Sequence, residues 1–327
     1  MLIVLVTIAI LATAAVSYGI YRLIRIPGVS SRWMERALTS GELELRASLM
    51  RDVASLASLT HRNEFDMRAL AEARNHIRES FRAAHLEPGA QSFRAGPVTH
   101  ENIFAIVEGT SRPAEIVVVG AHYDTVFDSP GADDNASGVA GMLAIARQVA
   151  KHPCDRTVHF VAFATEEPPY FRSDEMGSCV YAKSLRDQSA RVVSMLNIES
   201  IGFYASTPGS QLYPRFLGQF FPPVADFIAV VSDLSSRSIA RRCARSFGRT
   251  GVAVEAAALP RFIDEAGWSD QWSFWKYGYR AVMVTDTALF RNPNYHTPSD
   301  TPGTLDYDRM TRVVSALFDV VRGEASV

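Results

Sequence analysis

Short apolar runs alternate along this chain with longer amphipathic segments, and this alternation restricts the fold more than any other feature. The apolar runs are rich in Val, Ile and Phe and span residues 102–107, 116–120, 158–164, 192–198 and 281–285. They lack strict alternation of polar and apolar residues, which is typical of strands buried on both faces of a sheet. Segments with helical spacing are a pair within residues 44–85, then 137–151, 175–186, 235–247 and 308–321. The pattern predicts an α/β fold, a three-layer α/β/α sandwich with a mostly parallel mixed central sheet.

Length and charge narrow the class of protein further. A chain of 327 residues, of which 47% are hydrophobic, can bury one large core, so we expect a single main domain. The formal net charge of −2 is too close to neutral to indicate a protein that binds nucleic acid, and we expect no such partner.

The N-terminal segment differs from the rest of the chain. Residues 1–21 carry no charged side chain and are just numerous enough to cross a bilayer. A cleaved signal peptide is the alternative, because Ala12-Thr13-Ala14 offers small residues for cleavage, but no basic residue precedes the apolar run. We predict a transmembrane anchor or signal segment at residues 1–24, a linker at 25–43 and the main domain at 44–327.

Side chains that can bind metal follow several of the predicted strands. His122 and Asp124 come directly after the run 116–120, two residues apart and on the same side if the strand continues. Ligands of such sheets bind beyond the carboxyl ends of the strands. His122 can therefore bind a metal ion while Asp124 orients its other ring nitrogen.

Acidic residues occupy similar places further along the chain. Asp134 lies in the turn from Gly131 to Gly138, where its carboxylate can bridge two cations, with helix capping as the alternative role. Glu199 ends the apolar run 192–198. A carboxylate at the end of a further buried strand favours a shared site over coincidence.

Glu166 and Glu167 form a pair that follows the strand predicted at 158–164 after one residue, Thr165. Two adjacent carboxylates that leave a buried strand need a compensating charge, which a metal ion supplies. One of them can bind the metal while the other accepts a proton from water. A solvated acidic loop is the alternative interpretation.

A histidine and the charge balance complete the candidate site. His296 lies in the loop 293–298, which is bounded by Pro, after the last predicted strand. Mixed His and carboxylate ligands without thiolate suit zinc best. Three carboxylates and a bridging hydroxide would balance the charge of a pair of divalent ions, so we expect two Zn²⁺ per chain.

The order and spacing of these residues resemble the co-catalytic di-zinc exopeptidase family, which includes bacterial leucyl aminopeptidases, glutamate carboxypeptidase II, the transferrin receptor ectodomain and glutaminyl cyclases. The resemblance extends from about Leu49 to the C-terminus. Its signals are His122-Tyr123-Asp124, Gly131 to Gly138, Glu166-Glu167, Met176-Gly177-Ser178, Asn197-Ile198-Glu199 and Tyr295-His296-Thr297-Pro298. Each signal is weak alone, but their order and spacing together are specific.

The resemblance implies a zinc-dependent aminopeptidase, a hydrolase that acts on peptides with a free N-terminus. It makes His122 and Glu199 ligands of one zinc ion and Glu167 and His296 ligands of the other. Asp134 becomes the bridge between the two ions.

The resemblance also implies catalytic roles. Glu166 becomes the general base that activates the attacking water, and Tyr295 matches a tyrosine that in some relatives hydrogen-bonds the oxyanion. A cis peptide bond between Asp134 and Asn135 is a further implication. The segments 168–174 and 264–275 are expected to shape the substrate pocket, with plain aromatic packing as the alternative.

One departure and several alternatives accompany this assignment. The position of Glu199 is more often Asp in the better-known relatives. The alternatives are a single-zinc cyclase like the glutaminyl cyclases, a carboxypeptidase and a catalytically silent receptor-like ectodomain. The presence of His122 and of the Asp134-Asn135 pair favours the two-metal hydrolase, and silent members typically lose ligands. An acidic metal site attracts a free α-ammonium group, which favours an aminopeptidase.

The expected location follows from two opposing arguments. Arg22, Arg25 and Arg32 follow the apolar segment, and by the positive-inside rule they would leave the main domain in the cytoplasm. Tethered exopeptidases usually work outside the cytoplasm. We expect a membrane-anchored protein with a periplasmic or extracellular catalytic domain, and a cytoplasmic orientation stays open.

Overall fold

A mixed sheet of eight strands forms the centre of the computed structural model, which describes residue 7 and residues 18–27, 32–214 and 216–326. The strand order is β1-β2-β4-β3-β5-β8-β6-β7. The strands are β1 (Gly89–Ala95), β2 (Val98–Val107), β3 (Arg112–His122), β4 (Arg156–Phe163), β5 (Arg191–Glu199), β6 (Ile228–Asp233), β7 (Val254–Leu259) and β8 (Ala281–Thr285).

The central strands β4, β3, β5 and β8 run parallel to one another, whereas β2 and β6 pair antiparallel with them at the two sides. The chain segments that follow the parallel strands therefore meet at one edge of the sheet. All five predicted strands are present. The strands β1, β6 and β7 were not predicted, and β7 in particular is rich in Ala, which has a low preference for strands.

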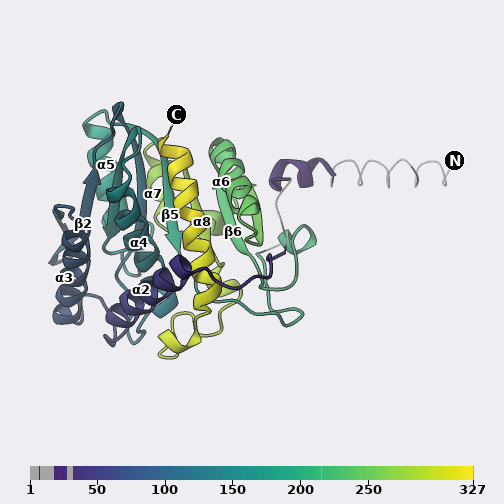
Figure 1. The fold of residues 1–327 in the computed structure, drawn as a ribbon, viewed down its shortest axis with the longest axis horizontal. Coiled ribbons are helices and arrows are strands. Elements are labelled where there is room, and N and C mark those ends of the chain that lie inside the picture. Colours follow the sequence, from purple (N-terminus) through teal and green to yellow (C-terminus); the bar gives the residue numbers. More distant parts are fainter. Residues whose placement is uncertain (1–6, 8–17, 28–31, 215, 327) are drawn as a thin grey trace.

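Helices cover both faces of this sheet and confirm the predicted three-layer sandwich (Figure 1). One face carries α2 (Ser40–Leu56), α3 (Met67–Ala83), α4 (Gly138–Lys151), α6 (Arg237–Arg249) and α8 (Tyr307–Ala325). The other carries α5 (Gly177–Asp187) and α7 (Gln271–Lys276). Over β8, β6 and β7 this second face is covered mainly by residues 203–214 and 216–226, which form no α-helix.

The start of the main domain differs from the prediction. Helix α2 begins at Ser40, inside the segment predicted as a linker, because Thr39 and Glu42 form a capping box: the Thr39 side chain accepts a hydrogen bond from the Glu42 N–H, and Glu42 accepts one from the Thr39 N–H. The earlier part of the predicted linker is also attached to the domain. Ile26 is buried and its N–H donates to the Ala256 carbonyl at 3.0 Å.

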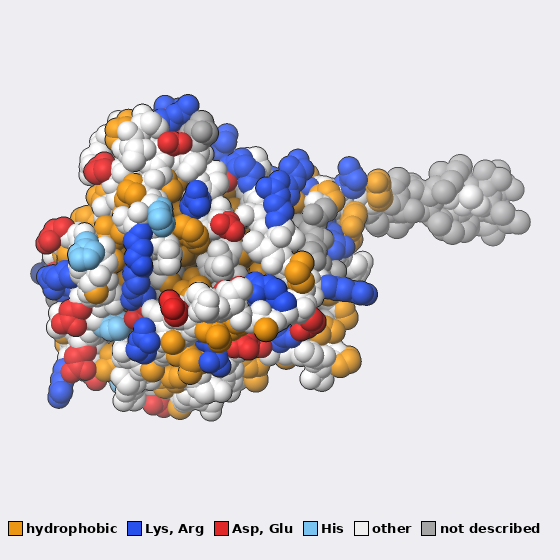
Figure 2. Space-filling model, viewed as in Figure 1, with side chains coloured by type: hydrophobic (Ala, Val, Ile, Leu, Met, Phe, Trp, Pro, Cys, Tyr) orange, Lys and Arg blue, Asp and Glu red, His pale blue; other side chains and the backbone are white. Residues whose placement is uncertain are grey.

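Most of the predicted anchor lies outside the described residues. Its end, residues 18–24, is helical. Within the described ranges, no helix combines the length and the apolar character needed to cross a membrane. Figure 2 shows Lys and Arg side chains interspersed with Asp and Glu over the face of the domain that it views.

Candidate metal centre

The predicted metal-binding residues meet at the carboxyl ends of the parallel strands. His122 ends β3, Glu199 ends β5, and Glu167 follows β4 after a turn. Asp134 lies in a turn of π-helix (Ala132–Ser137) that leads into α4, and His296 lies in the loop between β8 and α8. Adjacent strand ends and two loops thus bring together residues that are up to 174 positions apart, from His122 to His296.

Two sets of ligand atoms share Asp134. The Nε2 atom of His122 lies 3.1 Å from Asp134 Oδ1 and 3.2 Å from Glu199 Oε2. The Nε2 atom of His296 lies 3.1 Å from Asp134 Oδ2 and 3.2 Å from Glu167 Oε1. Each carboxylate oxygen of Asp134 therefore faces a different imidazole, with one further carboxylate in each set.

The arrangement of the donor atoms suits zinc binding better than hydrogen bonding between the side chains. His296 Nε2 and Glu167 Oε1 are buried and have no hydrogen-bond partner within the described part of the chain, although they lie 3.2 Å apart. Two ligand atoms bound at about 2.1 Å to a tetrahedral zinc ion are separated by roughly 3.4 Å. The observed separations are close to that value, and the N and O donors are those that zinc prefers.

Buried negative charge gives the site its electrostatic character. Burial raises the pKa of Glu166 well above its usual range. Burial, together with the charge of Asp134, raises the pKa of Glu167 to about 7. The two imidazoles overcome the effect of burial at Asp134 and hold its pKa below the usual range. Carboxylates crowded in this way favour a bound cation that offsets their repulsion.

Asp124 contacts more than His122. Its carboxylate accepts hydrogen bonds from the backbone N–H groups of Glu166 and Glu167, both at 3.1 Å. His122 Nδ1 lies 3.6 Å from Asp124 Oδ1 but only 3.2 Å from the Asp124 carbonyl oxygen. The hydrogen-bond partner of His122 Nδ1 is thus the backbone carbonyl of Asp124 and not, as predicted, its carboxylate. The carboxylate instead fixes the turn that carries both glutamates.

Backbone geometry around the site is unusual. Thr165 (φ 56°) and His296 (φ 57°) adopt the left-handed conformation, which costs energy for residues other than Gly and is enriched at functional sites. The peptide bond between Asp134 and Asn135 is cis, as the resemblance implied. The Asn135 side chain accepts hydrogen bonds from the N–H groups of Gly138 and Ser200 and holds the turn against β5.

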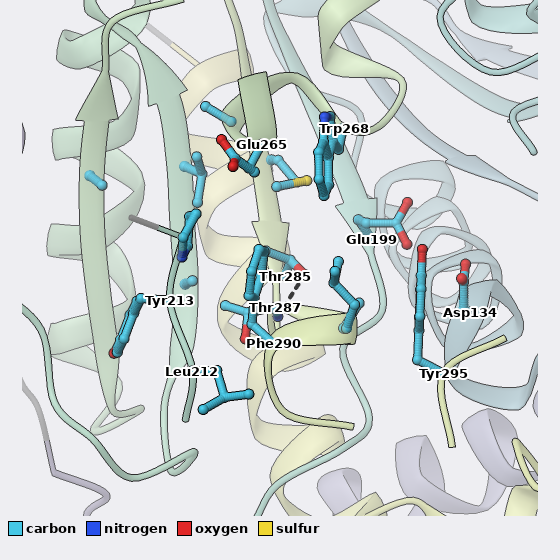
Figure 3. A pocket seen from close by; sticks show the side chains of 18 of the residues that line it. Asp134, Glu199, Leu212, Tyr213, Glu265, Trp268, Thr285, Thr287, Phe290 and Tyr295 are labelled. Atoms are coloured by element: carbon cyan, nitrogen blue, oxygen red, sulfur yellow. Dashed lines mark hydrogen bonds between the residues drawn. The ribbon is translucent and has the colours of Figure 1, made fainter. Parts of the chain in front are cut away.

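Tyr295 lies beside the ligands. Its ring is stacked on the His296 ring with the centroids 3.8 Å apart, and it lines the cavity at the metal centre together with Glu166. Figure 3 shows Tyr295 on the same side of this pocket as Glu199 and Asp134. Of the segments expected to shape the pocket, 168–174 contributes Pro168 and Phe171 to its lining, and 264–275 contributes Glu265, Ala266 and Trp268.

Ser269 is a neighbour of the site that the sequence did not reveal. Its hydroxyl donates to Glu199 Oε2 at 2.6 Å, and its oxygen accepts a hydrogen bond from Asn197 Nδ2 at 2.9 Å. A hydrogen bond of this kind fixes the orientation of a ligand. Ser269 lies 70 positions from Glu199 in the chain, so only the fold brings them together.

The substitution Ser269→Ala should loosen Glu199 and lower the affinity for zinc of the set that contains His122 and Glu199. We expect a loss of about 10- to 100-fold at that set, with a smaller change at the set of Glu167 and His296. Competition with a zinc chelator measures both affinities. The exposed Ser58→Ala is the control, and equal affinities in Ser269→Ala and wild type would contradict the assigned contact.

Arg62 is a second residue that the sequence did not reveal. Its guanidinium is fully buried and donates to the backbone carbonyls of Tyr123 at 2.7 Å, Gly131 at 3.1 Å and Leu56 at 3.2 Å, and also to that of Pro130. Burial lowers its pKa to about 10, so it stays charged near neutral pH. Arg62 ties the segment after β3 to the turn that carries Asp134.

Replacement of Arg62 by Met should destabilise the protein, because several buried carbonyls would lose their donor. We expect a decrease of about 3–5 kcal/mol in the free energy of unfolding. Urea denaturation measures this change. Arg68→Met removes only an exposed pair with Glu72 and should cost less than about 0.5 kcal/mol. Similar losses in both variants would contradict the structural role of Arg62.

The fold and the site together define a class of protein. A three-layer α/β/α sandwich with two sets of buried His and carboxylate groups at its strand ends is suited to metal-dependent hydrolysis. The chain belongs to peptidase family M28, whose sequence model matches residues 102–321. It is therefore a metallopeptidase, and zinc is the metal of this class.

Individual proteins extend the comparison. The chain is 37% identical to the uncharacterised protein YfbL of Escherichia coli K12 over 77% of this chain and 80% of that one. It is 26% identical to a probable leucine aminopeptidase of Trichophyton verrucosum, over 81% of this chain and 69% of that protein. The zinc aminopeptidase BSAP of Bacillus subtilis has the same fold, with a TM-score of 0.69, 16% identity, and coverage of 86% of this chain and 95% of that one.

Proposed function

We propose that this protein is a two-zinc aminopeptidase that removes the N-terminal residue of a peptide. The position of Asp134 carries this proposal: its two oxygens each lie 3.1 Å from a different imidazole, that of His122 and that of His296. Glu199 completes the first set and Glu167 the second. Zinc ions held there would polarise the carbonyl of the scissile bond and lower the pKa of the attacking water.

Glu166 is the general base of the proposed reaction. It is buried at the cavity, and Asp124 holds its backbone N–H at 3.1 Å, so its carboxylate stays beside the ligands without being needed in either set. It accepts the proton of the attacking water and then donates that proton to the leaving amine. Burial raises its pKa, which favours both acceptance and later donation near neutral pH.

Tyr295 supports the same reaction from the opposite loop. The stacked His296 ring restrains its aromatic ring at the cavity wall. Burial keeps its pKa far above neutral, so the hydroxyl remains a hydrogen-bond donor. We assign that hydroxyl to the negative charge that develops on the substrate carbonyl oxygen.

A free N-terminus is the proposed recognition element. The site carries several buried carboxylates, and a positively charged α-ammonium group complements them better than the carboxylate of a C-terminus does. The similarity to a probable leucine aminopeptidase supports the same choice. A single zinc ion would need only one of the two sets, yet His122 and Glu199 form a further set with Asp134 and lie 3.2 Å from each other.

Hydrolysis of aminoacyl anilides tests the proposal. Protein of measured zinc content is assayed with substrates whose N-terminus is free or acetylated, and with a peptide that begins with Gln. We expect hydrolysis of the free substrates only, with two zinc ions per chain. Cleavage confined to blocked substrates would overturn the aminopeptidase function, and cyclisation of the Gln peptide with a single zinc ion would establish the cyclase instead.

The membrane tether remains part of the proposal. We propose that residues 1–24 anchor the chain and that the catalytic domain lies outside the cytoplasm. Extraction of membranes with carbonate and access of an external protease to the domain test the two parts separately. Release by carbonate would contradict the anchor, and protection from the protease would place the domain inside.

A further inference from the structure

The cavity at the metal centre continues along the sheet, well beyond the candidate ligands. It extends over the face of β8, β6 and β7 that residues 203–214 and 216–226 cover in place of an α-helix. In Figure 3, Glu199 and Tyr213 lie on opposite sides of this pocket, with Thr285 and Thr287 between them. We call this extension the apolar groove, defined by floor residues Thr285, Ala229 and Glu255 and by roof residues Leu212, Tyr213 and Phe221.

Strand pairing gives the groove its direction and length. Glu199 of β5 pairs with Thr285 of β8, Thr285 pairs with Ala229 of β6, and Ala229 pairs with Glu255 of β7. These paired residues form a single row across the sheet, from a candidate zinc ligand to a second buried carboxylate. Neighbouring strands lie about 4.8 Å apart, so the row is roughly 14 Å long.

The lining of the groove is mainly apolar, although Gln211, Glu265 and Thr287 also line the cavity, and no bulky side chain occupies the middle of its floor. Ala229 occupies that position, flanked by Val231 and Met283 in the next row. The cavity as a whole has a volume of about 290 Å³. An apolar cavity of roughly 150 Å³ already holds benzene, so the space exceeds what one Leu or Phe side chain fills.

A polar pair closes the far end. Glu255 is 2% exposed, its Oε2 lies 3.0 Å from Arg25 Nη2, and its Oε1 has no hydrogen-bond partner among the described residues. Arg25 is itself held in place. Its backbone carbonyl accepts a hydrogen bond from the Arg237 side chain at 2.9 Å, and the Arg25 guanidinium lies 5.7 Å from the centre of the Phe221 ring. Arg25 of the N-terminal segment therefore holds in place the residue that ends the groove.

We propose that the apolar groove binds the side chain of the substrate's first residue and selects an unbranched apolar chain of about eight to ten carbons. An extended chain advances roughly 1.2 Å per bond, and such a chain fills the distance from the metal centre to Glu255. This inference rests on the proposed aminopeptidase function. Ala229 determines the specificity, because any larger side chain there would divide the groove.

A series of 2-aminoalkanoyl anilides whose side chains have four to twelve carbons tests the proposal. The ratio kcat/KM is expected to rise on the order of threefold per added methylene up to about eight to ten carbons, and then to fall where the chain meets Glu255. A maximum at four to six carbons would overturn the groove and leave the aminopeptidase function standing. If no member of the series is hydrolysed, the proposed aminopeptidase function is wrong. The binding of 1-decanol to the protein then tests the groove independently.

The substitution Ala229→Leu provides the matched variant. It should move the preferred chain length below six carbons and lower the ratio of kcat/KM for the ten-carbon substrate to that for the four-carbon substrate by at least tenfold. Ala47→Leu makes the same chemical change on the exposed side of α2 and should leave the chain-length profile unchanged. An unchanged profile in Ala229→Leu would overturn the proposal.

Binding of 1-decanol to zinc-free protein gives a readout that needs no catalysis. Calorimetry should detect saturable binding of 1-decanol, weaker binding of 1-butanol and a negative heat-capacity change. Ala229→Leu should weaken decanol binding by at least tenfold, with its fold checked by urea denaturation. Absence of saturable binding, or binding that Ala229→Leu does not alter, would overturn the groove.

Discussion

Replacement of Glu166 by Gln should lower kcat/KM for aminoacyl anilides by about 100- to 10,000-fold, the range that a general base contributes. The amide has nearly the shape of the carboxylate but cannot accept the proton of the attacking water. The backbone contact between the Glu166 N–H and Asp124 does not involve the side chain and should persist. Steady-state kinetics on zinc-loaded protein measures the effect.

Zinc content decides how a loss of activity in Glu166→Gln is interpreted. Glu166 lies close to His122 and Glu167, so it could also act as a ligand. If Glu166 is a base and not a ligand, Glu166→Gln should still bind two zinc ions. If Glu166 is a ligand, the variant should bind fewer. The exposed Glu175→Gln, in the same segment, is the control and should retain full activity. Undiminished activity in Glu166→Gln would refute the proposed mechanism.

Asp134→Asn should remove zinc from both positions. Its two oxygens face different imidazoles, and the amide supplies one neutral oxygen in place of two charged ones. We expect the affinity for both ions to fall by more than about 100-fold, beyond the effect of a residue that only orients a ligand. Metal analysis after dialysis should find fewer than one zinc ion per chain.

A comparison with the neighbouring ligand makes this second prediction specific. Glu199→Gln alters only the set that contains His122, so about one zinc ion should remain. Asp128→Asn is the control, because Asp128 is exposed and its left-handed backbone (φ 62°) suits Asn. Retention of two ions in Asp134→Asn would show that Asp134 does not bridge them.

The architecture could be predicted where the signal is local. Buried parallel strands appear as continuous apolar runs, and the helices between them repeat their apolar residues with a helical period, so both are visible within a short window of sequence. Strand β7 has no such signal, since half of Val254 to Leu259 is Ala. It is a strand because β6 and the N-terminal segment pair with it. Its place at the end of the sheet is a tertiary effect.

The same division applies to the site. The identities of the candidate ligands and of the candidate base could be read from the sequence, because acidic residues and histidines follow the strands in an order that resembles a known family. The sequence pattern also predicts which segments are strands and which are loops, and this places these side chains at one edge of a parallel sheet.

Only the tertiary structure decided how those residues are held and what lies beyond them. The bond from Ser269 to Glu199, the contacts of Arg62 with the turn before α4, and the Arg25 pair with Glu255 join segments 70, 69 and 230 positions apart. Such contacts depend on the packing of whole layers, so no local pattern predicts them. The apolar groove belongs to the same category, because its floor is a row of residues from three strands that only sheet pairing aligns with Glu199.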